Sequence, residues 1–268
     1  MTTTGTTTDA ATERPHARTE EADGILTVVP DRDAKLNAIS PQITEVLWAA
    51  VRQLADRPEV RALVITAVGR YFSAGIDLRA AVSAGAASDG IEFRAGYRRH
   101  HLLYDEMEAI EKPIVLAAQG PCLGAGLEMA CSVDFRFAAE GARFQLPEVG
   151  LGTVPGSGGT SRLTRLVGPH WGKWMAMAGR GIDAAQALNI GLVHEVFPDD
   201  GFHAAVHDRV REIIALPAEA LGAAKLAVDM VADVDRRTAR DIERLANTHL
   251  IVGGGFEPHR RAFTGEQS

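Results

Sequence analysis

The chain has 268 residues, of which 46% are hydrophobic and 24% charged, as in a globular protein that buries a sizeable core. Its 28 Lys and Arg against 35 Asp and Glu give a formal net charge of −7, so it lacks the basic surface that nucleic acid requires. Its apolar runs are far shorter than the roughly 18 residues of a membrane span, and no secretory signal pattern opens the sequence. We therefore expect a cytoplasmic protein without nucleic-acid or membrane partners.

The N-terminal segment differs sharply from the sequence that follows it. Residues 1–22 are rich in Thr and almost free of large apolar side chains, so they gain too little from burial to offset their ordering entropy. This composition predicts a disordered tail over residues 1–22. The β-rich run at residues 25–29 then predicts the first buried strand.

A helix with clear ends follows. Ser40 before Pro41 is typical of a helix start, and the apolar spacing after it predicts a helix over residues 41–56, ended by Pro58. The apolar residues 60–68 have the pattern of a buried strand. A strand, a helix and a second strand in this order indicate an α/β protein.

The same alternation continues to about residue 200, which predicts one core domain over residues 23–200. Its further elements are expected at 97–110 (helix), 114–118 (strand), 127–131 (short helix), 133–138 (strand) and 143–145 (strand), with a Gly/Ala/Ser-rich linker at 82–90. Beyond it, amphipathic patterns predict helices near 203–215, 218–232, 236–251 and 256–263. We therefore expect a C-terminal helical region over residues 201–268.

Several isolated motifs fall short of a known site. The glycines of 124–126 and 152–159 complete neither a dinucleotide fingerprint nor a phosphate-binding loop, and no serine stands in a GxSxG turn. His100 and His101 are adjacent on an expected helix and point in different directions, so we expect ordinary, partly buried side chains. Cys122 and Cys131 have no histidine at ligand spacing, which favours buried thiols over a metal site or a disulfide.

Four segments, taken together and in this order, resemble the enoyl-CoA hydratase/isomerase (crotonase) superfamily. They are DAKLNAIS at 33–40, GRYFSAGIDLRA at 69–80, KPIVLAAQGPCLGAGLEMACSVDFRFA at 112–138 and ARFQLPEVGLGTVPGSGGTSRLTRLVG at 142–168. The resemblance covers about residues 24–263. It implies an α/β crotonase (ClpP-like) spiral of ββα-type turns, followed by a C-terminal helical region that assembles trimers, or hexamers as dimers of trimers.

The resemblance also implies an oxyanion hole, a pair of N–H donors that stabilise the negative charge on a thioester oxygen. The donors would be the backbone N–H groups of Ile76 and Ala125, because these residues take the family's donor positions in SAGID and GAG. At these positions the family usually has a small residue and a glycine. The larger side chains of Ile76 and Ala125 therefore make the oxyanion hole narrower. Gly75 and Gly124 precede the donors and let the backbone approach a ligand closely.

Two carboxyls match the catalytic glutamates of hydratases. By resemblance, Glu128 activates water for attack at C3, and Glu148 delivers a proton to C2. Taken singly, each would be an ordinary helix-end or turn residue, but both stand inside family motifs. The expected reaction is the reversible addition of water to a trans-2-enoyl-CoA, giving a 3-hydroxyacyl-CoA. It uses no metal and no separate cofactor, since coenzyme A is part of the acyl-CoA thioester substrate.

Two other reactions and one non-catalytic role remain open. A Δ3,Δ2-enoyl-CoA isomerase needs only one carboxylate, which Glu148 alone could supply. Dienoyl-CoA isomerases share the wording GIDL, but they carry an acidic residue where this sequence has Gly156. A protein of the same fold that binds acyl-CoA without catalysis would need neither glutamate.

The resemblance places coenzyme A between the first two motifs and the glycine turn. The expected substrate-binding residues are Lys35, Leu36, Ala38, Ala74, Gly75, Asp77, Leu78, Arg79 and Gly124, with Arg79 close to a phosphate. The acyl pocket is expected from residues 82–96 and the helix after them, including Tyr97 and Leu103. Arg260 and Arg261 resemble the basic stretch that, in the family, reaches the nucleotide of a neighbouring subunit.

Overall fold

A six-stranded sheet forms the centre of the protein, in a computed structural model that describes residues 15–81 and 89–265. In spatial order its strands are β1 (Ala17–Ala22), β2 (Ile25–Pro30), β3 (Ala62–Ile65), β4 (Ile114–Ala118), β6 (Phe135–Ala139) and β9 (Glu195–Phe197). Only β1 runs antiparallel to its neighbour, and every other pair is parallel. Every residue of β2, β3 and β4 is buried, as expected where helices cover both faces of a parallel sheet.

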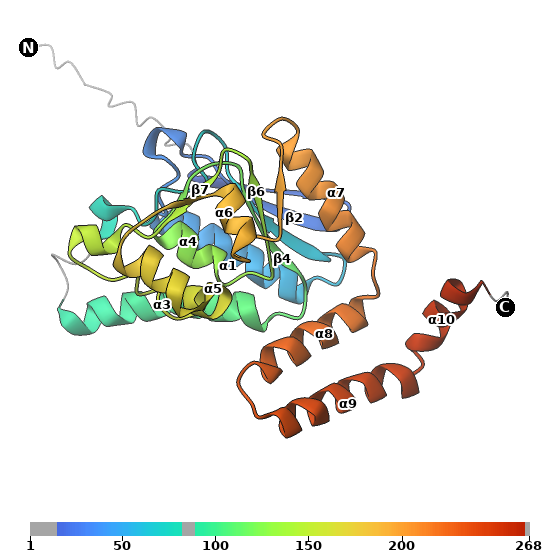
Figure 1. The fold of residues 1–268 in the computed structure, drawn as a ribbon. Helices are drawn as coiled ribbons and strands as arrows, with labels where there is room; N and C mark the ends of the chain where they lie inside the picture. The colour runs from blue at the N-terminus through green and yellow to red at the C-terminus, as the bar shows by residue number, and fades with distance from the viewer. Residues whose placement is uncertain (1–14, 82–88, 266–268) are drawn as a thin grey trace, which may run out of the picture.

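A smaller sheet lies beside the first and contains β5 (Cys122–Leu123), β7 (Arg143–Gln145) and β8 (Ile182–Asp183). The chain passes between the two sheets repeatedly: β4 and β6 belong to the large sheet, whereas β5 and β7 belong to the small one. Short helices fill the turns of this path, among them α4 (Ala125–Ala130) and α6 (Ala184–Asn189). This alternation produces the spiral of ββα-type turns that the sequence predicts (Figure 1).

Helices pack on opposite faces of the large sheet because side chains alternate along each strand. On β3, Leu63 and Ile65 join the cluster that contains α1 (Pro41–Asp56), whereas Ala62 and Val64 join the cluster that contains α7 (Phe202–Ile214). The helix α7 therefore packs on the core sheet, although it belongs to the predicted C-terminal region.

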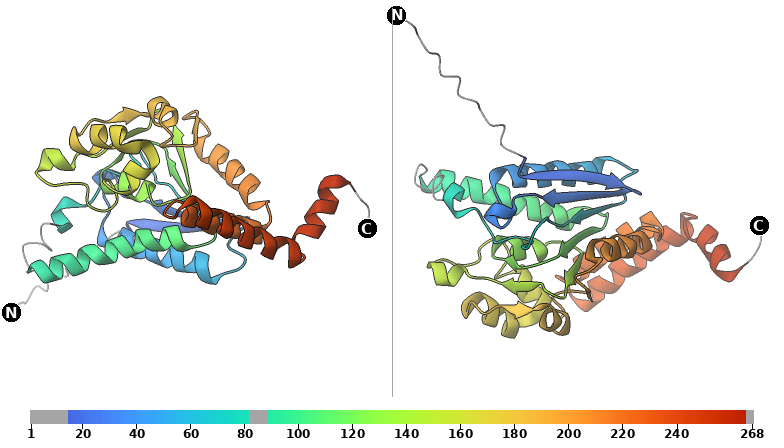
Figure 2. Two further views of the ribbon diagram at one scale, coloured as in Figure 1. Left: turned by 60° about the horizontal axis from the view of Figure 1, so that its bottom comes forward. Right: turned by 90° about the horizontal axis from the view of Figure 1, so that it is seen from above.

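The remaining helices surround the small sheet or extend from the body. The long α3 (Gly90–Ala109) and α5 (Arg162–Gly172), which continues into a π-helical turn at Lys173–Met177, lie on the outside (Figure 2). The last three helices are α8 (Ala218–Val231), α9 (Arg236–Val252) and α10 (Phe256–Thr264). In Figure 1 both α9 and α10 stand away from the body, and α10 also does so in the two views of Figure 2.

The structure corrects the predicted N-terminal tail. Residues 17–22 form β1, which pairs with β2 from Ala17 opposite Pro30 to Ala22 opposite Ile25. Only Ala17 of this strand is buried, so backbone hydrogen bonds rather than side-chain burial define it. Residues 1–14 and 82–88 lie outside the described residues, which leaves the first part of the tail and most of the predicted linker untested.

Two further observations concern residue types considered above. Cys122 and Cys131 are buried free thiols, as predicted, and burial raises the pKa of both. Over residues 15–81 and 89–265, no helix is both long and apolar enough to cross a membrane, and no group of three or more His, Cys, Asp and Glu is arranged to hold a metal ion.

Candidate active site

Two loops that are distant in sequence are joined by backbone hydrogen bonds. The N–H of Ser73 donates to the carbonyl of Pro121 at 3.1 Å, and the N–H of Leu123 donates to the carbonyl of Ser73 at 2.8 Å. The two glycines that follow have positive φ, +97° at Gly75 and +51° at Gly124. A Cβ on Gly75 would lie only 3.2 Å from the Leu123 carbonyl oxygen, so glycine is what allows this close approach.

The two predicted N–H donors lie directly after these glycines. If Gly75 had a Cβ atom, this atom would lie 3.4 Å from the Ala125 nitrogen. The segment leading to Ile76 therefore lies beside the start of α4. In the described part of the chain, neither the Ile76 N–H nor the Ala125 N–H has a hydrogen-bond acceptor. The structure therefore leaves two backbone donors free on adjacent segments.

Glu128 projects from the first turn of α4 and is only 4% exposed. Its Oε1 accepts hydrogen bonds from the N–H groups of Ser157, at 2.6 Å, and Gly159, at 3.0 Å. Burial raises the pKa of this carboxyl, while the two N–H donors act in the opposite direction. The carboxylate is thus held in one orientation by backbone groups of a single loop.

Glu148 opens the 3-10 turn Glu148–Leu151, which follows Pro147. Its Oε1 faces Gly124 and lies 2.7 Å from where a Cβ on that glycine would stand. Its Oε2 is buried and has no hydrogen-bond partner among the described residues. Burial, together with the negative charge of Glu128, raises the pKa of Glu148 to about 7, so near neutral pH it exists both with and without a proton.

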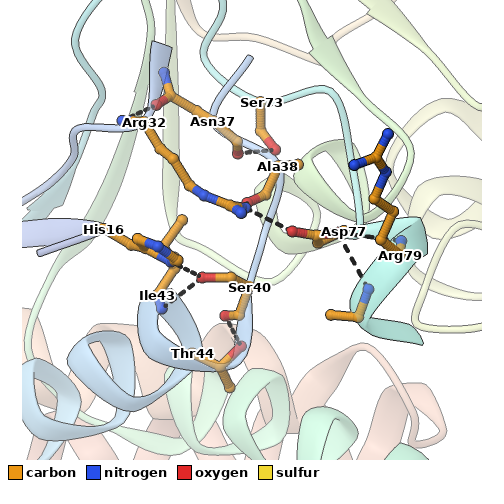
Figure 3. A network of polar contacts seen from close by, with 11 residues as sticks. His16, Arg32, Asn37, Ala38, Ser40, Ile43, Thr44, Ser73, Asp77 and Arg79 are labelled. Carbon is orange, nitrogen blue, oxygen red and sulfur yellow. Dashed lines mark hydrogen bonds and ion pairs between the residues drawn. The ribbon is translucent and has the colours of Figure 1, made fainter. Parts of the chain in front are cut away.

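A polar network fixes the loops that precede this site (Figure 3). Arg32 donates to Asp77 Oδ2 at 2.7 Å, and Asp77 Oδ1 accepts from the N–H groups of Arg79 and Ala80 where a helical turn begins. The pair is largely shielded from solvent, with side-chain exposures of 18% and 16%. Burial alone would raise the pKa of Asp77, but its hydrogen bond with Arg32 outweighs that effect and lowers it.

Asn37 connects the same loop to its neighbours. Its side-chain oxygen accepts from the Arg32 N–H, and its amide group donates to the carbonyls of Val68 and Tyr71. Ser73 then links this loop to the donor loop, because its hydroxyl donates to the Asn37 carbonyl and accepts from the Gly75 N–H. These roles of Arg32 and Asn37 were not predicted, since the polar motif DRDAKLN gives no sign of the partners.

Apart from Gly124, which precedes α4, the predicted coenzyme A residues lie on two adjacent segments. The Ala74 N–H donates to the Leu36 carbonyl at 2.9 Å, and the Ile39 N–H donates to the Gly75 carbonyl at 2.8 Å. The side chains of Lys35 and Arg79 are exposed, and Leu78 is 53% exposed. In contrast, Arg32 and backbone N–H groups engage the Asp77 carboxylate, so its side chain acts within the protein.

The helix α3 borders the site on another side. His100 Nε2 is 2.9 Å from the Tyr104 hydroxyl, which donates to the Ala125 carbonyl at 3.2 Å and so supports the start of α4. Burial lowers the pKa of His100 to about 4. Leu103 is fully buried in the core, whereas Tyr97 is 38% exposed. Of the two predicted pocket residues, Tyr97 is therefore the one on the surface.

Arg260 and Arg261 lie on α10 and both pair with Glu257 of the same helix. In Figure 1 this helix is far from α4, so these side chains do not reach the site of their own chain.

Comparison with known proteins identifies the family of this chain. The profile of the family described as enoyl-CoA hydratase/isomerase matches residues 20–253. The crotonyl-CoA hydratase of Syntrophomonas wolfei is 36% identical over 221 residues, covering 81% of this chain and 83% of that protein. The enoyl-CoA isomerase/hydratase fer4 of Mycosarcoma maydis is 34% identical over 232 residues, 83% of each protein. The crystal structure of enoyl-CoA hydratase from Bacillus anthracis matches with a TM-score of 0.87 at 27% identity, covering 94% of this chain and 97% of that one. The chain thus belongs to the enoyl-CoA hydratase/isomerase family and has the crotonase fold.

Proposed function

We propose that this protein is an enoyl-CoA hydratase, which adds water reversibly to a trans-2-enoyl-CoA to give a 3-hydroxyacyl-CoA. One observation carries the proposal: two carboxyls, Glu128 and Glu148, lie beside two free backbone donors, the N–H groups of Ile76 and Ala125. The hydratase names of relatives at 33–36% identity support the same activity.

In the proposed reaction, the thioester oxygen accepts hydrogen bonds from the N–H groups of Ile76 and Ala125. These donors stabilise the negative charge that develops when water attacks C3. Glu128, ionised and held by two N–H groups, takes the proton that water loses. Glu148, whose pKa of about 7 leaves it partly protonated, gives a proton to C2. No step is assigned to a metal or a redox cofactor.

Isomerase activity is the second candidate. A Δ3,Δ2 shift moves one proton from C2 to C4, and the raised pKa of Glu148 suits such a transfer. The name of the fer4 relative combines both activities. A dienoyl-CoA isomerase is less well supported, because a side chain at Gly156 would collide with the Tyr97 hydroxyl and no acidic group stands at that position.

The test is the loss of enoyl-thioester absorbance when the purified protein meets crotonyl-CoA, beside the variants Glu128→Gln and Glu148→Gln. We expect each variant to lower kcat by at least 100-fold. Glu128→Gln keeps a side-chain oxygen that accepts hydrogen bonds from the N–H groups of Ser157 and Gly159, and it removes a buried charge. We therefore expect the melting temperature of this variant to be unchanged or higher. Full activity in the double variant would contradict the proposal. Binding of acyl-CoA without turnover would indicate a non-catalytic protein, and conversion of 3-enoyl-CoA alone would indicate an isomerase.

The proposal extends to ligand and assembly. Coenzyme A would lie along the segments that contain Lys35, Leu36 and Ala38 and, facing them, Ala74, Leu78 and Arg79, with the Arg79 guanidinium near a phosphate. The chain would assemble as trimers or hexamers in the cytoplasm, with Arg260 and Arg261 directed towards a neighbouring subunit.

A further inference from the structure

Three rings follow one face of α3. Phe93, Tyr97 and His101 are spaced by four residues, so they lie one above another on the helix. The rings of Phe93 and Tyr97 stack with centroids 5.8 Å apart, and His101 meets Tyr97 edge-on at 4.8 Å. The face therefore changes from apolar to polar along the helix axis.

The polar end of this face lies against the loop that holds Glu128. The Tyr97 hydroxyl occupies the space that a Cβ on Gly156 would need. The next residue along the chain, Ser157, donates its N–H to Glu128. A positive charge on His101 would lower the pKa of Glu128, so the imidazole lies within electrostatic reach of the carboxyl. Tyr97 and His101 thus border the same site as the two glutamates.

Neither polar group has a partner in the part of the chain that the structure describes. His101 Nε2 is buried and has no hydrogen bond among the described residues, and within the same ranges the Tyr97 hydroxyl has none either. Buried polar atoms are nearly always hydrogen-bonded in folded proteins, and an unpaired one next to a binding site favours a ligand that supplies the missing bond.

We infer that Tyr97 and His101 form a specificity subsite for a neutral oxygen, a hydroxyl or a carbonyl, on the acyl group of the substrate. This inference rests on the proposed function, because it places the acyl chain beyond Glu128 and Glu148. Both Tyr97 and a neutral histidine can donate or accept, so either oxygen type fits. A carboxylate is disfavoured, because the proposed reaction keeps Glu128 ionised on the same side, and two negative charges repel each other.

The experiment compares acyl groups of equal length. The probes are pent-2-enoyl-CoA with its 5-hydroxy derivative and hex-2-enoyl-CoA with its 6-hydroxy derivative. In the unmodified protein we expect kcat/KM to favour at least one hydroxy derivative about tenfold over its parent compound. Tyr97→Phe and His101→Phe keep a ring in place, and each should reduce this ratio about threefold or more. Arg98→Ala, at an exposed position of α3, is the matched control and should keep the ratio.

A second measurement separates this inference from the proposed function. Calorimetric titration with hexanoyl-CoA and 6-hydroxyhexanoyl-CoA, which cannot be hydrated, measures the preference without turnover. Tighter binding of the hydroxy compound, weakened in both variants, would support the subsite even if crotonyl-CoA were not hydrated. Equal binding of hexanoyl-CoA and 6-hydroxyhexanoyl-CoA, together with equal kcat/KM within both enoyl-CoA pairs, would overturn the inference. Tighter binding of a further probe, the CoA thioester whose six-carbon acyl group ends in a carboxylate, would also overturn it.

Discussion

At the scale of single residues, the two glutamates differ in what surrounds them. Burial raises the pKa of Glu128, but its two backbone hydrogen bonds act against this and favour the ionised form. One oxygen of Glu148, in contrast, is buried without a partner in the described ranges. Two carboxyls with unlike environments can hold one proton between them, and an acid and a base then coexist at the same pH. Water addition needs this combination.

The first prediction concerns pH. The pair works with one proton, so kcat/KM should fall as pH rises through about 7, where Glu148 loses its proton, and should fall again in acid once Glu128 is protonated. Hydration and dehydration should share one profile, because water addition exchanges no net proton. Stopped-flow absorbance in both directions measures this. Glu148→Gln should remove the decline near pH 7, and an unchanged decline in that variant would assign the titration to another group.

The second prediction concerns Gly124. A Cβ there would lie 2.7 Å from Glu148 Oε1 at a φ of +51°, so Gly124→Ala should displace the carboxylate and lower kcat/KM at least tenfold. The matched control is Gly150→Ala, since nothing lies within 4 Å of its Cβ position and its φ is ordinary. Similar crotonyl-CoA kinetics for the two variants would mean that Glu148 does not depend on this contact.

At the scale of elements, the sequence predicts best those segments whose ends carry a local signal. The helix α1 has its predicted bounds because the Ser40 side chain accepts from the Ile43 N–H and Pro41 occupies the first turn. The start of α3 was expected seven residues too late: Asp89 caps it, but Gly90 and Gly96 weaken the helical pattern. The strand β1 gave no signal, since it exposes five of its six residues.

The candidate site shows the same division. The motifs predict the glutamates and the glycines before the donors, because each motif is contiguous in sequence. Contacts between distant segments were not predictable: Arg32 and Asp77 are 45 residues apart, and the hydroxyl of Tyr97 reaches Gly156 from another helix. Hydrophobic periodicity indicates on which face of its own helix or strand a side chain lies. It does not indicate which loop packs against that face.

The third prediction tests the Arg32–Asp77 pair, which joins two of these segments. Arg32→Ala leaves Asp77 partly buried without its partner and should lower the free energy of unfolding by about 1–3 kcal/mol. The same variant should raise KM for acyl-CoA, since the loop of residues 73–79 loses a fixed position. Arg18→Ala is the control: Arg18 is 45% exposed in its pairs with Glu20 and Asp31, so its loss should cost less than about 1 kcal/mol. Equal losses in urea denaturation would contradict this.

At the scale of the whole molecule, the last three helices contain many apolar side chains that no described residue covers. Those exposed on α8, α9 and α10 include Leu226, Val228, Met230, Leu245, Ile251, Val252, Phe256 and Phe263. No residue of α9 is buried. An amphipathic helix of this kind usually has a partner for its apolar face, which agrees with the proposed assembly.

The fourth prediction follows from that surface. Light scattering after size exclusion should give three or six times the 28.6 kDa chain mass. Leu245→Glu with Ile251→Glu should shift the protein towards monomers, because each change buries a charge if the helices associate. Glu243→Gln, a nearby change on the same helix, should keep the assembly. A monomer at micromolar concentration in the unmodified protein would exclude the proposed trimer.

The hydrogen bonds between Ser73 and the segment Pro121 to Leu123 have a consequence for how this protein can change. Ser73, three residues before the Ile76 donor, is bonded to Pro121 and Leu123, and Leu123 stands two residues before the Ala125 donor. We therefore expect a substitution that moves one loop to move the other as well and to leave the spacing of the donors nearly unchanged. We therefore expect adaptation to a new acyl group to change side chains such as Phe93, Tyr97 and His101 of α3, which, unlike Tyr104, make no hydrogen bond to the donor segments among the described residues. Laboratory selection for altered substrates should accumulate changes at positions 93, 97 and 101, and spare positions 73–76 and 121–125.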